Sequence, residues 1–362
     1  MLGFITLFFS FFIFFDGLSQ PGESGWYKHL VGKIGTHPIT MHLHKEGNEY
    51  AGYYYYHSKH QPISLRGEDT SIQGKISLYT YTDWNEGEQF VFDIKNNIAE
   101  GTWQMNHDKK VFAFSAIPNN TLLAFTHVFL KGERALIPDS SFTPYGTIDL
   151  ASVWPVNASP ADKAIGMEIR KLFGVASGEE DISMIFTKQK NDYLDQYIAD
   201  YKNESLEDIR QYGFAYAIST HSKVMIAYHS PKWLNLASYH YSYYGGAHGM
   251  YGNSYKVISL ETNKKLELND LLNQEGIDIL GELLEKYFRI QNKLKPTDPL
   301  QEGGLFENNL APNNNFYLTA MGIGFAYMPY EIASYARGEV EVFIPLKEIM
   351  PYLRPSAKNL LQ

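Results

Sequence analysis

Between residue 26 and about residue 118, short apolar runs alternate with turn residues at a spacing of about 10 residues, and no helical period separates them. Turn segments such as Gly47-Asn48, Asn96-Asn97 and Asn106-His107-Asp108 lie between the runs. The runs predict eight strands, at 27–32, 39–45, 50–57, 62–67, 75–82, 89–95, 98–104 and 110–115. Short strands at regular intervals are typical of a β-sandwich or an up-and-down barrel, so this region is predicted to be all-β.

A resemblance favours the barrel over the sandwich. The run Gly-Tyr-Tyr-Tyr-Tyr at 52–56, the segment 62–67 with Pro62 and Gly67, and Gly-Thr-Trp at 101–103 resemble the small calycin-like domains of secreted Bacteroidetes proteins. The resemblance implies an eight-stranded barrel over residues 21–118 and says nothing about a ligand. The interior of such a barrel either holds a ligand or is filled by its own side chains.

Beyond residue 118 the pattern changes to a mixture of helices and strands. A turn-rich segment at 119–145 is the predicted domain junction, and 146–362 is predicted to be an α+β domain with an antiparallel sheet and flanking helices. Ser159, Pro160 and Asp162 are typical of a helix start. The expected helices are 159–174, 177–202, 277–291 and 346–353, and the expected strands are 213–220, 223–230, 234–243, 315–319, 322–327 and 340–345.

The first 20 residues indicate export. Residues 1–15 are almost wholly apolar, and small and polar residues follow them, which is the pattern of a cleavable signal peptide. The run ends at Asp16, short of the roughly 20 residues that a bilayer-spanning helix needs. No Lys or Arg precedes the run, so an uncleaved anchor remains the alternative. Both alternatives place the rest of the chain outside the cytoplasm, in the periplasm or on the cell surface.

Composition excludes several classes of function. The chain has no cysteine, which removes disulfides, thiolate nucleophiles, zinc–thiolate sites and a lipid-modified cysteine. Its formal net charge of -9 provides no basic surface for a phosphate backbone, so a nucleic-acid partner is not expected. The same acidity favours encounter with a cationic protein.

Several linked motifs occur in the second domain: Tyr-Tyr-Gly-Gly-Ala-His-Gly at 243–249, Phe-Tyr-Leu-Thr at 316–319, and Pro-Tyr-Glu-Ile-Ala-Ser-Tyr-Ala at 329–336. In this order they resemble the extracellular domain of lysozyme-sensing anti-sigma factors, which also occurs as an accessory domain in certain peptidoglycan deacetylases. The resemblance implies an envelope-exposed binding module, with lysozyme as the partner in one branch. It implies no catalysis, because the deacetylase chemistry belongs to a separate domain whose metal-binding motifs do not occur here.

The glycine-rich motif at 243–249 and the motif at 329–336 supply the candidate binding residues. A polar-tipped aromatic group beside a glycine loop suits recognition, and glycine permits positive φ and close backbone approach. Glu331 is either a recognition carboxylate or a tie within a turn, and the glycine segment is either a ligand-facing loop or a tight connection between strands. The predicted ligand-binding residues are Tyr243, Tyr244, Gly246, His248, Tyr330 and Glu331.

No catalytic residue, metal ligand or cofactor is predicted. His42 and His44 lie two residues apart on one strand, so both rings face the same side, which is interpreted as a solvated face rather than a metal site. The function expected from the sequence is an exported envelope protein that binds lysozyme or peptidoglycan. The alternatives are a hydrolase or deacetylase of envelope polysaccharide, which needs two well-placed carboxylates or a metal cluster, and a purely structural envelope module.

Overall fold

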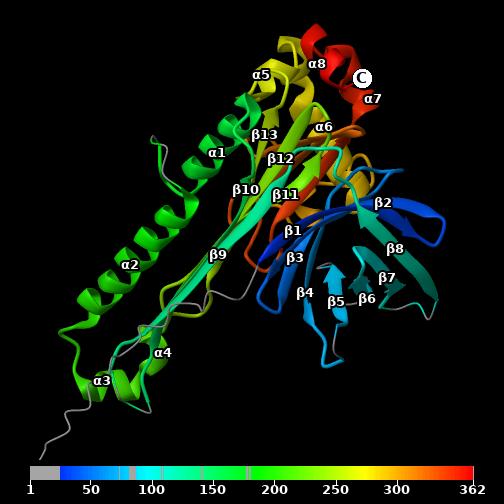
Figure 1. Cartoon of the computed structure of the whole chain (residues 1–362). Coiled ribbons are helices and arrows are strands. Elements are labelled where there is room, and N and C mark those ends of the chain that lie inside the picture. The colour runs from blue at the N-terminus through cyan, green and yellow to red at the C-terminus, as the bar shows by residue number, and fades with distance from the viewer. Residues whose placement is uncertain are drawn as a thin grey trace, which may run out of the picture.

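A computed structural model describes residues 25–72, 74–80, 87–106, 108, 110–138, 140, 142–176, 178 and 181–361 (Figure 1). These residues form a closed barrel, a six-stranded sheet and a three-stranded sheet. The predicted signal peptide at 1–20 lies outside them. Within these ranges, no helix has the length and hydropathy needed to cross a bilayer.

The first domain is the predicted eight-stranded antiparallel barrel, which closes by pairing of its first and last strands. Side chains alternate between the two sides of each strand, so one set points into the barrel. Sixteen buried side chains, among them Tyr54, Phe90, Phe92 and Phe114, form a single apolar cluster inside it. The barrel interior is therefore filled by its own residues. The strands are β1 (Trp26–Ile34), β2 (His37–Glu46), β3 (Glu49–Tyr56), β4 (Ile63–Asp69), β5 (Ile76–Thr80), β6 (Glu88–Lys95), β7 (Ile98–Met105) and β8 (Val111–Pro118).

The second sheet has the order β14-β13-β12-β11-β10-β9 and is mixed, because β10 and β11 pair in parallel. Strand β9, which begins within the predicted junction, pairs along its whole length with β10. The predicted domain boundaries remain a prediction. The strands are β9 (Phe125–Ala135), β10 (Tyr145–Pro155), β11 (Ile218–His229), β12 (Trp233–Tyr243), β13 (Met250–Ser259) and β14 (Lys264–Lys265).

One strand prediction was wrong. The segments 213–220 and 223–230 were expected to be two strands, but they form a short helix α4 (Gly213–Tyr216) followed by the single strand β11. Neighbouring strands on both sides continue past Ser222, since it pairs with Leu150 of β10 and with His240 of β12. Pairing on both sides keeps the backbone extended where the polar residues alone suggested a turn.

Two long helices cover one face of this sheet (Figure 1). Helix α1 (Pro160–Leu172) begins at the predicted cap, where Ser159 and Asp162 form a reciprocal capping box. Helix α2 (Ile182–Tyr201) begins at Asp181, whose side chain accepts from a backbone N–H. Both helices bury apolar side chains against β10–β12, and a third, α3 (Leu206–Gln211), follows them.

The C-terminal part confirms the predicted strands and the predicted helix 277–291. Helix α6 packs its apolar side against the three-stranded sheet. The helix expected at 346–353 is instead broken near Pro351, because proline at the start of a 3-10 turn interrupts the α-helical hydrogen bonds. The elements are α5 (Leu268–Leu271), α6 (Gln274–Gln291), η1 (Leu300–Gly303), β15 (Phe316–Thr319), β16 (Gly322–Tyr327), β17 (Val340–Pro345), α7 (Leu346–Ile349), η2 (Met350–Tyr352) and α8 (Pro355–Leu361).

The barrel packs on the face of the six-stranded sheet that lies opposite α1 and α2. Tyr53 of β3 joins Met225, Ala237 and Tyr255 in one small core, whereas the alternate residues of β11 and β12 face the helices. The same core includes Tyr317 of the three-stranded sheet. Barrel and three-stranded sheet therefore cover one end of this sheet face together.

Candidate functional site

The other end of the same sheet face carries tyrosines. On β12, Ala237 is buried, while Tyr239, Tyr241 and Tyr243 follow on the same side of the strand and are only partly buried. Tyr241 lies directly opposite Tyr251 of β13. The tyrosine row thus runs out from beneath the barrel toward the glycine-rich segment.

The loop between β16 and β17 brings further rings to this end. The ring of His248 stacks on Tyr335, with centroids 3.9 Å apart and planes inclined by 22°. Tyr251 meets the same Tyr335 ring edge to face, with centroids 5.8 Å apart, and the Tyr330 ring centroid also lies 5.8 Å from that of Tyr335, with planes inclined by 33°. Tyr335 is therefore the centre of a group that we call the aromatic cluster: His248, Tyr251, Tyr330 and Tyr335.

The glycine-rich segment has the conformation that the sequence predicts. Gly245 and Gly246 have φ of 76° and 112°, values that side-chain-bearing residues rarely adopt. The Tyr243 hydroxyl donates to the Gly246 carbonyl over 3.0 Å, and His248 Nδ1 donates to the Gly249 carbonyl over 3.0 Å. A Cβ at Gly249 would lie 2.5 Å from the ring of Tyr241, so a larger residue at this position would displace that ring. These bonds hold His248 in place on Tyr335.

The 328–335 loop is built to expose Tyr330. This residue has φ of 70°, which is unusual for a bulky side chain, and 51% of its surface is exposed. Glu331 accepts from the Met328 backbone N–H over 2.9 Å and from Asn313 Nδ2 over 2.8 Å. The Glu331 carboxylate therefore ties the loop together, as one of the two sequence interpretations expected.

Two carboxyl groups lie beside the covered end of the tyrosine row. Glu341 is on β17, and Glu339 immediately precedes this strand. Glu339 accepts from the backbone and side-chain N–H groups of Asn253, and Glu341 accepts from the Tyr317 hydroxyl. Burial raises the pKa of Glu341 to about 7, against the opposing effect of the Tyr317 hydrogen bond. Burial and the charge of Glu341 raise the pKa of Glu339 to about 7 as well. Both groups can exchange a proton near neutral pH.

The structure brings only some of the predicted binding residues together. His248 and Tyr330 both contact Tyr335, and Tyr243 closes the adjacent loop. Tyr244 is 65% exposed and lies near Tyr193 of α2, on the helix side of the sheet. Sequence reasoning missed Tyr251 and Tyr335 as site residues. Both lie within or next to the motifs that carried the resemblance, but only their contacts identify them.

The interpretation of His42 and His44 as residues of a solvated face was wrong. Their rings do face one side, but that side is fully buried against the six-stranded sheet. There the ring centroids of His44 and His127 lie 5.2 Å apart. Burial lowers the pKa of both His42 and His44 well below the usual value. Within the described residues, no three His, Asp or Glu side chains are placed to hold a metal ion.

Two family models match the part of the chain that follows the barrel. Residues 149–251 match the family "Deacetylase PdaC", and residues 269–347 match "Protein of unknown function (DUF3298)". The first match ends at Tyr251 and the second includes Tyr330 and Tyr335, so the aromatic cluster combines residues of both matches. The resemblance predicted from the sequence is confirmed. No curated protein matches the chain.

One solved structure of low sequence identity shows the same fold over about two thirds of this chain. A crystal structure of a DUF3298 family member from Bacteroides fragilis is similar with a TM-score of 0.58 and 21% identity, covering 66% of this chain and 98% of that one. A DUF3298 family protein from Pseudomonas aeruginosa is similar with a TM-score of 0.44 and 17% identity, covering 65% of this chain and 96% of that one.

Proposed function

We propose that this protein is an exported component of the cell envelope, in the periplasm or on the cell surface, that binds the glycan of peptidoglycan through the aromatic cluster. The observation that carries the proposal is the stacked pair His248 and Tyr335, flanked by Tyr251 and the exposed Tyr330. The match of residues 149–251 to a deacetylase family supports a polysaccharide context.

The chemistry of the cluster suits a sugar. The C–H faces of a pyranose ring pack on the π-faces of aromatic side chains, and the hydroxyl and imidazole tips of those side chains offer hydrogen bonds to sugar hydroxyls. Tyr330 is held with positive φ in a loop that Glu331 ties down, so its ring costs little further ordering when a ligand binds.

The role proposed is binding rather than catalysis. The carboxyl groups near the cluster already have hydrogen-bond partners within the protein. Glu339 accepts two bonds from Asn253, and Glu341 accepts one from Tyr317. Glu331 is likewise engaged with the backbone of its own loop. These carboxyl groups therefore position loops and strands around the cluster.

Cosedimentation with insoluble peptidoglycan tests the proposal. We expect the protein to sediment with the glycan, and Tyr335→Ala and His248→Ala to bind about tenfold more weakly, because each removes half of the stacked pair. Tyr79→Ala is the matched control, since Tyr79 is an exposed tyrosine (46%) on the outside of the barrel. Equal binding by all three variants and the unchanged protein would exclude the cluster as the site.

Lysozyme is titrated in parallel, because the acidic chain and the family resemblance allow a cationic protein partner. If lysozyme binds saturably, if Tyr335→Ala abolishes that binding, and if peptidoglycan does not bind, the cluster is a protein-docking site and the glycan assignment is wrong.

A further inference from the structure

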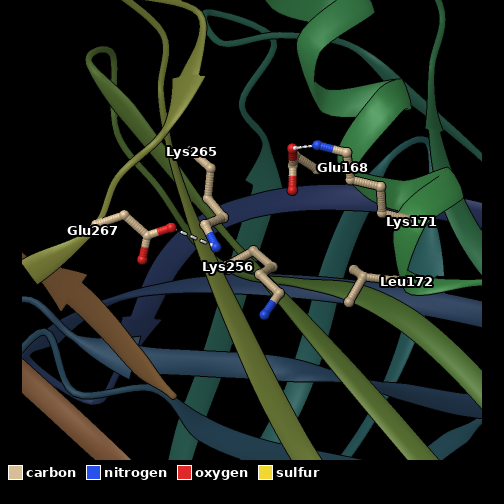
Figure 2. Close-up of a pocket in the computed structure, with 6 residues that line it drawn as sticks. All are labelled: Glu168, Lys171, Leu172, Lys256, Lys265 and Glu267. Carbon is tan, nitrogen blue, oxygen red and sulfur yellow. Dashed lines mark hydrogen bonds and ion pairs between the residues drawn. The ribbon is translucent and has the colours of Figure 1, made fainter. Parts of the chain in front are cut away.

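A cavity of about 370 Å³ lies on the helix side of the six-stranded sheet, away from the aromatic cluster (Figure 2). The last turns of α1, strand β13, strand β14 and the start of α5 surround it. Its lining consists of one apolar and five charged side chains: Glu168, Lys171, Leu172, Lys256, Lys265 and Glu267.

Four of the charged side chains are already paired. Lys171 Nζ lies 2.7 Å from Glu168 Oε1, and Lys265 Nζ lies 2.7 Å from Glu267 Oε1. Glu168 is itself buried, so its pair with Lys171 forms a fixed wall of the cavity. In Figure 2 the two ion pairs lie on different sides of the cavity, and the Lys256 side chain lies below them with its nitrogen pointing away from both.

Lys256 is the unpaired cation of this site. Its ammonium group makes no hydrogen bond or ion pair with any residue that the structure describes, although the side chain is partly buried. Burial lowers the pKa of Lys256 and the neighbouring charge of Lys265 lowers it further, against the opposing charges of Glu168 and Glu267, neither of which bonds to the ammonium group. A partly buried ammonium without an acceptor lacks hydrogen-bond partners that an anion would supply.

The charge of the lining indicates which anion fits. Three lysines and two glutamates give a net formal charge of +1, from 3 − 2, so a monoanion balances the site. A phosphate dianion would exceed this charge and meet the two glutamates. Leu172 supplies an apolar wall against which a short carbon chain can pack.

We propose that this cavity binds the carboxylate of a small organic acid or of a peptide end, with Lys256 as the residue that pairs with it. The carboxylate accepts from Lys256 Nζ, and the attached apolar group lies against Leu172. The site faces away from the aromatic cluster, because Tyr255 points toward the barrel and its neighbour Lys256 points to the opposite side of β13. Its test therefore does not depend on glycan binding.

Calorimetric titration of the protein with N-acetylalanine at pH 8 tests the proposal, with N-acetylalaninamide as the uncharged analogue and inorganic phosphate, which is mainly the dianion at this pH, as the second anion. We expect saturable binding of the acid alone. Lys256→Met, which keeps an unbranched apolar side chain and removes the ammonium group, weakens this binding at least tenfold. Lys163→Met, at an exposed lysine of α1, leaves it unchanged.

A second measurement uses the unaltered protein, so the test remains valid even if Lys256→Met does not fold. NMR titration of the Lys256 ε-methylene group against pH should show its pKa rising when N-acetylalanine is added, because a bound carboxylate favours the charged ammonium. The proposal is overturned if the acid does not bind, if the amide binds equally well, if phosphate binds more tightly, or if the acid leaves the pKa of Lys256 unmoved.

Discussion

The two ends of one face of the six-stranded sheet differ: the barrel covers one end, and the other end is open to solvent. At the covered end, the barrel buries Glu46 with Lys223 of β11 and His127 of β9. At the open end, Tyr251 and the loop that holds Tyr335 leave aromatic rings exposed to solvent. The barrel therefore divides this sheet face into a buried region, where contacts between the barrel and the sheet stabilise the folded chain, and an open region that a ligand can reach. Variants at the covered end should change unfolding, and variants at the open end should change binding.

The largest expected effect is at the buried ion pair. Glu46→Ala leaves Lys223 and His127 without their acceptor in the interface, so we expect a loss of about 3–5 kcal/mol in the free energy of unfolding. The matched control is Glu49→Ala, which breaks the exposed pair between Glu49 and Lys131 and should cost no more than about 1 kcal/mol. Urea unfolding at pH 7 measures both. Equal losses in the two variants would contradict the distinction between buried and exposed ends.

The second-largest expected effect is a loss in the free energy of unfolding at acid pH, caused by buried histidines at the covered end. Burial lowers the pKa of His29 to about 4 and of His229 to about 3, whereas an unfolded histidine titrates near 6.5. Between these values the unfolded chain binds more protons, so stability is lost as the pH falls from about 6.5 toward 3. At the low-pH limit His29 contributes on the order of 3 kcal/mol to this loss and His229 on the order of 5 kcal/mol.

Substitution of His229 separates this effect from general acid unfolding. Neither ring nitrogen of His229 makes a hydrogen bond with the described residues, so His229→Leu removes the titration without breaking a bond. Unfolding followed at several pH values should show a shallower acid loss in His229→Leu, and no change in slope in His37→Leu, at an exposed position of β2. An unaltered slope in His229→Leu would refute this source of acid sensitivity.

The carboxyl groups beside the tyrosine row should give a smaller pH dependence of stability, with a sign opposite to that of the buried histidines. An unfolded glutamate loses its proton near 4.5, but Glu341 keeps it until about pH 7, so its contribution to stability is present below 4.5 and lost as the pH rises to 7. Glu341→Gln preserves an acceptor for Tyr317 and does not titrate. We expect the variant to gain about 2 kcal/mol over the unchanged protein between pH 5 and pH 8, a value reduced because the side chain is partly exposed. A pH-independent difference between the two proteins would contradict the raised pKa.

Local signals in the sequence predicted much of the fold. Turn segments such as Asn96-Asn97, where both residues have positive φ, mark the barrel hairpins, and the Ser159 cap marks the start of α1. The burial of His42 was not predictable, because it depends on the barrel docking against strands more than 80 residues away in the chain. The aromatic cluster needed the same tertiary information, since Tyr335 meets Tyr251 only when two separate motifs fold together.

The most direct test of the account is the pairing of two measurements on Tyr335→Ala: urea unfolding and calorimetric titration with a soluble, N-acetylglucosamine-containing peptidoglycan fragment. We expect the free energy of unfolding to fall by only about 1–2 kcal/mol, since the ring is partly exposed and loses its contacts with three other rings, together with about tenfold weaker binding. Unchanged binding of the fragment, or no binding by the unaltered protein, would contradict the claim that the open end of the sheet is a glycan site.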